Sequence, residues 1–268
     1  MNPHEWLEMA RDPRFIPGIY NYCDRWCERC AFTDRCLNYA TSVQRGRPFD
    51  QNFDEDAELD TEALAEELTE VFQDTIELIR AVAEEEGIEL DTEAPEVEAE
   101  MARDREAMEH AEEHPLTEAA NRYIALVHDW FAMGPRRYRR DRDMLVEAAL
   151  PAGADPASVL DALEVIRWYQ FMISVKIQRA LSSREREADD PEFWEEMPKD
   201  SDGTAKVALI ALDRSIGAWG ALLPAFPQRQ AATLEILALL SRLRSDLEQE
   251  FPNAWAFVRP GFDEVGDR

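Results

Sequence analysis

Residues 155–181 read DPASVLDALEVIRWYQFMISVKIQRAL, and this stretch decides the fold class. Asp155 followed by Pro156 is typical of a helix start, because the carboxylate caps the first amide groups and proline fits the first helical position. Between Val159 and Ile177, apolar side chains occupy almost every face of the predicted helix. A helix that is apolar all round is a buried one. We therefore predict that residues 155–181 form the central helix of a bundle.

Outward from this helix, apolar residues recur every three or four positions after residue 59, and no stretch alternates as a strand would. The fold class is therefore predicted to be all-α, a bundle of about five principal helices with an N-terminal four-cysteine module that holds a metal or cluster. Residues 92–113 offer few side chains for burial and fit either a solvated helix or a mobile arm. The other helices are predicted over residues 59–86, 117–133, a short stretch ending at 150, 204–223 and 228–250, with Gly87, Gly134-Pro135, Pro224 and Pro252 placed to end them.

Three parts of the chain are expected to differ in role. Residues 1–49 form the cysteine module, residues 50–114 an acidic helical segment, and residues 115–268 the core of the bundle. The helix over residues 59–87 has an apolar face, and we expect it to bury that face in the same globular unit as the bundle.

The charge and hydropathy of the chain disfavour several classes of partner. Its 268 residues include 57 acidic and 29 basic side chains, a net charge of -28. Such a charge disfavours binding to nucleic acid and to anionic lipid. No apolar run approaches the roughly 20 residues that a membrane helix needs, and the charged start MNPHEWLEMARDPRF is unlike a signal peptide. We therefore predict a cytoplasmic protein without a membrane association.

The acidity is concentrated in one segment, because residues 50–113 contain 26 acidic side chains against three arginines. Two interpretations remain open. An acid-rich, lysine-poor surface keeps a protein hydrated in a salt-accumulating cell, and it also serves as a docking surface for a basic partner. Residues 136–142 hold five arginines beside a tyrosine, a pattern that suggests nucleic-acid binding in a basic protein. In this acidic chain, pairing with residues 50–113 or docking of a protein partner fits the arginines as well.

All four cysteines lie in the stretch YNYCDRWCERCAFTDRC, residues 20–36, with the spacing C-x3-C-x2-C-x5-C. Cytoplasmic proteins are kept reduced, and a chain with 45% hydrophobic residues builds a core without disulfides. Thiols so close together therefore predict a metal centre. Its ligands would be Cys23, Cys27, Cys30 and Cys36.

The spacing also bears on the kind of centre. Cys23, Cys27 and Cys30 stand at i, i+4 and i+7, which on one helix places neighbouring Cβ atoms about 5 to 6 Å apart along one face. Such a row suits a 4Fe-4S cluster, which we rank first. A single zinc ion, held by thiolates at about 2.3 Å, is the alternative, because side-chain rotation and a broken helix also gather thiols. Cys36 lies past a predicted bend and would return as the fourth ligand.

The first three cysteines, in the pattern C-x3-C-x2-C, resemble the cluster motif of radical SAM enzymes over eight residues. That resemblance implies a β/α barrel and a cluster with one open iron. This chain lacks the strand pattern of such a barrel and supplies a fourth cysteine, so we do not assign it to that family.

Charged residues also stand inside two apolar helices. Lys206 and Asp213 share a stripe of the helix over 204–223, and Lys176 lies between Val175 and Ile177 in the central helix. A charge in apolar surroundings needs a partner or a hydrated cavity. Two interpretations follow for Lys176, Lys206 and Asp213. These side chains line a pocket that binds an anionic ligand or carries out acid-base chemistry, or they form ion pairs between helices.

Together these observations predict a cytoplasmic helical protein that binds a 4Fe-4S cluster through four cysteines, for electron transfer or redox sensing with a redox or protein partner. The alternative is a zinc-stapled structural or interaction protein with no catalytic activity. No residue pattern names a reaction.

Overall fold

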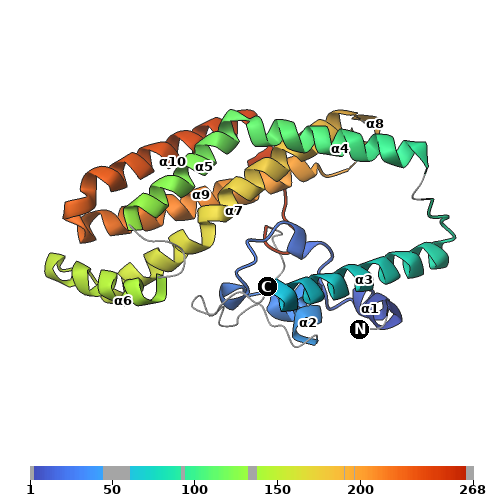
Figure 1. Ribbon diagram of the computed structural model, residues 1–268, viewed down its shortest axis with the longest axis horizontal. Coiled ribbons are helices and arrows are strands. Elements are labelled where there is room, and N and C mark those ends of the chain that lie inside the picture. The colour runs from blue at the N-terminus through green and yellow to red at the C-terminus, as the bar shows by residue number, and fades with distance from the viewer. Residues whose placement is uncertain are drawn as a thin grey trace. The chain divides into compact units, whose positions relative to one another are not determined.

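The computed structural model describes residues 3–44, 61–91, 94–131, 138–189, 191–195 and 197–263, and the regular elements in these ranges are all helices (Figure 1). The predicted all-α fold class is thereby confirmed for the described residues. The predicted break at Gly134-Pro135, residues 45–60 and the side chains of residues 136–142 lie outside the described part. The α-helices are α1 (Pro3–Ala10), α2 (Leu37–Gln44), α3 (Thr61–Glu86), α4 (Pro95–Glu113), α5 (Pro115–Phe131), α6 (Tyr138–Ala149), α7 (Pro156–Asp189), α8 (Pro191–Glu195), α9 (Asp200–Ala225) and α10 (Gln230–Glu250). Short 3-10 turns are η1 (Ile19–Asn21), η2 (Cys27–Arg29), η3 (Thr33–Arg35), η5 (Leu150–Ala152), η6 (Pro227–Arg229) and η7 (Ala254–Ala256).

The chain divides into two compact units. One, here called the N-terminal unit, comprises residues 1–21, 25–100 and 260–268, and the other, called the bundle unit, comprises residues 22–24 and 101–259. The three-part division drawn from the sequence stays a prediction.

Helix α7 is the central helix of the bundle unit, as predicted. It contacts α5, α6, α8 and α9, while α10 packs against α9 and α5 (Figure 1). The fully buried side chains of α7 recur every three or four positions and are Leu163, Ile166, Tyr169, Ile173, Ile177 and Ala180. The helix begins as the sequence predicts, because the Ser158 N–H donates to the Asp155 carboxylate at 3.0 Å.

Helix α7 also differs from its prediction in two ways. It continues past residue 181 to Asp189, and its last turns bury Ser183 and Glu187, which are bonded to the start of α9. It is not buried all round, because Phe171 is 49% and Val175 60% exposed. Phe171 and Val175 are four positions apart and so share a face of α7 that is exposed to solvent.

Aromatic side chains fill the centre of the bundle unit between α5, α9 and α10. Trp130 meets Trp219 edge-on with ring centroids 5.1 Å apart. The Trp219 indole N–H donates to the Tyr123 hydroxyl at 3.1 Å, and the Trp130 indole N–H donates to the Thr233 hydroxyl at 2.9 Å. Each buried indole N–H therefore has a partner, which is what lets tryptophan sit in a core without cost.

Helix α9 is long and apolar enough to cross a membrane by length and composition alone. It has 26 residues, a mean hydropathy of 1.3 over its most apolar 18-residue window, and half of that window is buried inside the protein. The core helix of a bundle passes the same test, so this is weak evidence for a membrane span. The absence of a membrane association and the cytoplasmic location stay predictions.

In the N-terminal unit, α1 packs against α3, and Arg11 pairs with Glu85 at 2.7 Å. Gly87 follows α3 with a φ of 68°, the left-handed conformation expected of a residue that ends a helix. On α3, Phe72 is 66% and Ile79 51% exposed, and the expected burial of the apolar face of this helix in one globular unit with the bundle stays a prediction. Within its own unit, the packing of α3 covers only part of its apolar face.

Candidate metal centre

The cysteine segment does not form the predicted helix. Cys27 opens the short 3-10 turn η2, and Cys30 follows that turn in an extended conformation, with φ -87° and ψ 128°. Cys36 follows the next turn, η3, and is also extended, with φ -108° and ψ 113°. The prediction that the thiols form a row on one helical face is therefore wrong. The geometric reason for ranking a cluster above zinc rested on that row and no longer applies.

The backbone just before Cys27 explains why no helix passes through this segment. Arg25 has a φ of 54°, the left-handed region that costs a residue with a Cβ about 1 to 2 kcal/mol. Trp26 follows with φ -84° and ψ 74°, also outside the helical region. A right-handed helix cannot continue through these two residues.

Local hydrogen bonds define the turn that carries Cys27 and Cys30. The Cys30 N–H donates to the Cys27 carbonyl at 3.1 Å. The Phe32 N–H donates to the Cys30 Sγ at 3.4 Å. The Cys30 sulfur thus accepts one backbone hydrogen bond within its own turn.

Aromatic side chains of the N-terminal unit surround the same turns. Trp26 is 9% exposed, and the Arg29 guanidinium lies 4.0 Å from its ring centroid. Phe32 meets Phe262 edge-on at 5.1 Å. The Ile16 N–H donates to the Arg35 carbonyl at 3.0 Å and ties the turns to the preceding chain. The segment is therefore a packed piece of structure.

The four thiols are not arranged as a ligand set. Over the described ranges, no three side chains among His, Cys, Asp and Glu are grouped closely enough to hold a metal ion. All four cysteines carry thiols and are half-buried. Cys23 belongs to the bundle unit, whereas Cys27, Cys30 and Cys36 belong to the N-terminal unit. The four-cysteine metal module is therefore not confirmed, and the 4Fe-4S cluster and the zinc ion both stay predictions.

Asp24, the neighbour of Cys23, is bonded to α7 and α9 through both its backbone and its side chain. Its carbonyl accepts the Trp168 indole N–H at 2.9 Å. Its carboxylate accepts the Tyr169 hydroxyl at 2.6 Å and the Arg214 guanidinium at 2.5 Å. Burial and the hydrogen bond to Asp24 raise the pKa of Tyr169 above its ordinary value. Sequence reasoning missed this cluster, because its members are 145 and 190 positions from Asp24.

Tyr22, the other neighbour of Cys23, is also held in the bundle unit. Its ring packs on Phe257 with centroids 4.6 Å apart. Burial, followed by the charge of Asp200 and a hydrogen bond to it, raises the pKa of Tyr22 to about 12. Asp200 is itself bonded to Arg179 at 2.7 Å and lies in the first turn of α9. Both neighbours of Cys23 are therefore fixed to the bundle.

The structure gives the surroundings of the charged residues that the sequence singles out, Lys176, Lys206 and Asp213. Lys206 is buried, and its ammonium donates to the Phe257 carbonyl at 2.6 Å and to the Trp255 carbonyl at 3.2 Å. Asp213 is exposed and paired with Arg244, and Lys176 is half-buried on α7. Lys206 is thus bonded to two backbone carbonyls, and Asp213 is paired with Arg244. The ligand pocket stays a prediction.

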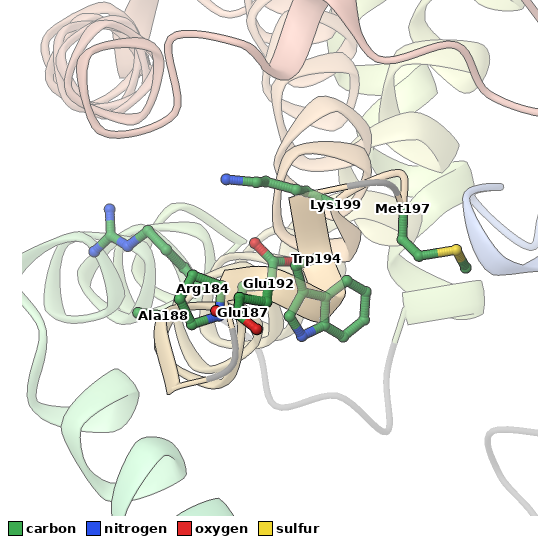
Figure 2. A pocket seen from close by; sticks show the side chains of 8 residues that line it. Arg184, Glu187, Ala188, Glu192, Trp194, Met197 and Lys199 are labelled. Atoms are coloured by element: carbon green, nitrogen blue, oxygen red, sulfur yellow. The ribbon is translucent and has the colours of Figure 1, made fainter.

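A cavity of about 630 Å³ lies elsewhere in the bundle unit, between the end of α7, α8 and the residues before α9 (Figure 2). Figure 2 shows the Trp194 and Met197 side chains on one side of it and Arg184 on the other. Glu187, in its wall, accepts the Ser201 N–H at 2.8 Å and the Ser201 hydroxyl at 2.5 Å. The cavity has the size of a small-molecule site, but none of the predicted site residues lines it.

Comparisons with protein-family models, with curated proteins and with solved structures find no match to this chain.

Proposed function

We propose that the chain binds a 4Fe-4S cluster through Cys23, Cys27, Cys30 and Cys36, for electron transfer or redox sensing. The observation that carries the proposal is the single run of four cysteines within residues 23–36. Iron-sulfur ligands commonly follow one another at gaps of two to four residues. Tetrahedral zinc sites instead separate two close pairs by a dozen residues or more. This reason does not depend on the helix that the structure lacks.

Two further features of the segment support a thiolate centre. The Phe32 N–H at 3.4 Å from the Cys30 Sγ stabilises negative charge on that sulfur. Residues 20–36 carry three acidic and three basic side chains and are locally neutral in a chain of net charge -28. Four thiolates would meet less repulsion here than in the acidic segment. Bound there, a cluster would supply a site that takes up and releases one electron.

The neighbours of Cys23 favour redox sensing over simple electron transfer. Asp24 is bonded to Tyr169 and Arg214, and Tyr22 is bonded to Asp200 at the start of α9. A change in the ligation of Cys23 would therefore pull on side chains of α7 and α9. An electron carrier has no need of such a linkage, whereas a sensor requires one.

A single zinc ion is the second candidate. The turn from Cys27 to Cys30, closed by a backbone hydrogen bond at 3.1 Å, is a C-x2-C arrangement, and zinc sites use that spacing. With zinc the segment would be a structural staple, and the protein would act by binding a partner.

The test is metal analysis of full-length protein purified without oxygen. We expect about four iron and four sulfide per chain and absorbance near 400 nm. Cys30→Ser is expected to retain less than about a tenth of the iron, because it removes a ligand. Glu28→Gln, in the same turn but exposed, is the matched control and should retain all of it. Circular dichroism of each variant verifies that the helices are intact.

The outcomes separate the candidates. Colourless protein with one zinc per chain, lost in the Cys30→Ser variant, overturns the cluster and supports the staple. Protein that is free of iron and zinc, and takes up neither on reconstitution, overturns both.

A further inference from the structure

Cys27 and Cys30 are held close together by the turn that links them. Cys27 opens η2, and the Cys30 N–H donates to the Cys27 carbonyl at 3.1 Å. In a 3-10 turn the side chains of residues i and i+3 eclipse, and a rise of about 2.0 Å per residue places their Cα atoms about 6 Å apart. The Cα atoms of disulfide-bonded cysteines are about 4.4 to 6.8 Å apart. The backbone therefore keeps these two thiols within bridging range.

The side chains of the two cysteines also point to the same side of the turn. The φ of Cys30 is -87°, within about 20° of the range of a 3-10 residue, and φ sets the direction of its Cβ. The ψ of Cys30, 128°, redirects only the chain that follows. Cysteines cannot bridge without backbone movement when their Cα atoms are more than about 7 Å apart or their Cβ vectors diverge. Neither condition holds for Cys27 and Cys30.

The other two cysteines are placed differently. The Cys36 N–H donates to the Thr33 carbonyl at 3.4 Å, so the residue that Cys36 eclipses across η3 is a threonine. Cys23 belongs to the bundle unit, not to the N-terminal unit. Among the four cysteines, all of which lie in the described ranges, Cys27 and Cys30 are thus the pair that a backbone hydrogen bond holds together.

Both thiols are half-buried, and Glu28 and Arg29 between them are exposed, so a small oxidant reaches this turn from solvent. We propose that Cys27 and Cys30 form a reversible disulfide in the metal-free chain, with hydrogen peroxide as the oxidant. The bridge itself does not depend on the metal centre. Its consequence for metal uptake rests on the proposed function, because a bridged chain has lost two of the four proposed ligands.

The chemistry of the bridge is balanced by one molecule of peroxide. Hydrogen peroxide oxidises one thiol to a sulfenic acid, and one water leaves. The other thiol attacks that sulfur, so that the S–S bond forms, the S–O bond breaks and its proton leaves with the oxygen as a second water. Two electrons thus pass from the two sulfurs to the peroxide. Two molecules of reduced glutathione reverse the step by thiol–disulfide exchange and leave as one oxidised glutathione.

The geometry also makes the bridge easy to reduce. Bridged cysteines have Cβ atoms about 3.8 Å apart, whereas eclipsed side chains of an unstrained 3-10 turn start about 6 Å apart. Closing the bridge therefore tightens the turn, and strained disulfides are the more reducible ones. The pair is thus suited to a switch and not to a permanent staple.

The experiment maps the disulfide in full-length protein that has been reduced, freed of metal with a chelator, treated with hydrogen peroxide, alkylated and digested with trypsin. Trypsin cleaves after arginine, so each cysteine falls in a peptide of its own, residues 15–25, 26–29, 30–35 and 36–45. Mass spectrometry should find peptides 26–29 and 30–35 joined in at least about tenfold excess over any other pair, because the turn orders these two thiols in advance. Cys27→Ser should abolish this link, and Cys36→Ser, the matched control, should still form it.

Four results would overturn the inference. These are another cysteine pair in excess, a link found only in dimers on a non-reducing gel, thiols that reach the sulfinic acid without bridging, and a link that excess reduced glutathione does not open.

Metal uptake, measured separately, distinguishes this inference from the proposed function. The bridged chain should take up less than about a tenth of the metal bound by the reduced chain, because metal ligands must be thiolates. A reduced chain that takes up neither iron nor zinc refutes the proposed function and leaves the bridge intact. A chain that loads metal when reduced but does not bridge after chelation refutes the bridge alone.

Discussion

Gly203→Ala is expected to destabilise the bundle unit, although alanine normally stabilises a helix. Gly203 lies in the first turn of α9, beneath the packed rings of Tyr22 and Phe257. A Cβ at this position would lie 2.5 Å from the Tyr22 Cε1 and 2.6 Å from the Phe257 Cζ. Atoms at that separation overlap, so both rings must move.

The magnitude follows from two opposed contributions. Alanine in place of glycine contributes about 0.5 to 1 kcal/mol to a helix. Inserting a methyl group into a packed site costs about 1 to 3 kcal/mol. Taking the middle of each range, the net expected loss is about 1 kcal/mol of the free energy of unfolding. For a unit of this size, that lowers the melting temperature by about 2 to 4 °C.

The assay is thermal and urea unfolding of full-length protein followed by circular dichroism, with Gly217→Ala as the matched control. Gly217 lies in the same helix, and a Cβ there would meet no atom within 4 Å. This control should therefore gain about 0.5 to 1 kcal/mol. If Gly203→Ala is stabilised as much as Gly217→Ala, Tyr22 and Phe257 do not pack on α9 as described, and the anchoring of Cys23 by Tyr22 is lost with them.

Two more predictions concern buried polar groups of the bundle unit. Lys206→Met keeps the length of the side chain but leaves the Trp255 and Phe257 carbonyls without their ammonium donor. We therefore expect the free energy of unfolding, measured in urea, to fall by about 2 to 3 kcal/mol. An unchanged urea midpoint would refute the buried hydrogen bonds. Burial raises the pKa of Tyr123 to about 12. Above about pH 10 the unfolded tyrosine loses its proton while the folded one keeps it, so the free energy of unfolding falls as the pH rises from about 10 to 12, by up to about 1.4 kcal/mol per pH unit for this group. Tyr123→Phe should have a shallower slope in urea midpoints measured at pH 9, 10 and 11, and an identical slope would contradict the assignment.

Much of the fold could be predicted from local patterns. The cap at Asp155, the proline after it and Gly87 act within one turn of the chain, so their residue types are sufficient to place a helix end. The burial of α7 follows from the spacing of its apolar residues. Exposure of Phe72 could not be predicted this way, because a periodic pattern says which side chains share a face and not whether anything covers that face.

The cysteine segment shows where spacing misleads. Positions i, i+4 and i+7 are compatible with a helix, but they do not require one. Arg25, with its left-handed φ, directly follows Asp24. The Asp24 carbonyl accepts a hydrogen bond from Trp168, and its carboxylate accepts hydrogen bonds from Tyr169 and Arg214. Bonds to residues so distant in the chain have no counterpart in the local sequence, and they outweigh a weak helical preference over a dozen residues.

Bonds to distant residues also explain why Lys206 resembles a ligand-binding residue in the sequence. A lysine among alanines and leucines needs either a ligand or a protein acceptor. Its acceptors are the backbone carbonyls of Trp255 and Phe257, and a backbone carbonyl is present at every position whatever the residue type. No sequence pattern can therefore distinguish a lysine that holds a distant loop from one that faces a pocket. Since Tyr22 also packs on Phe257, the lysine and Gly203 together hold two remote segments against the start of α9, and one of those segments is the chain immediately before Cys23.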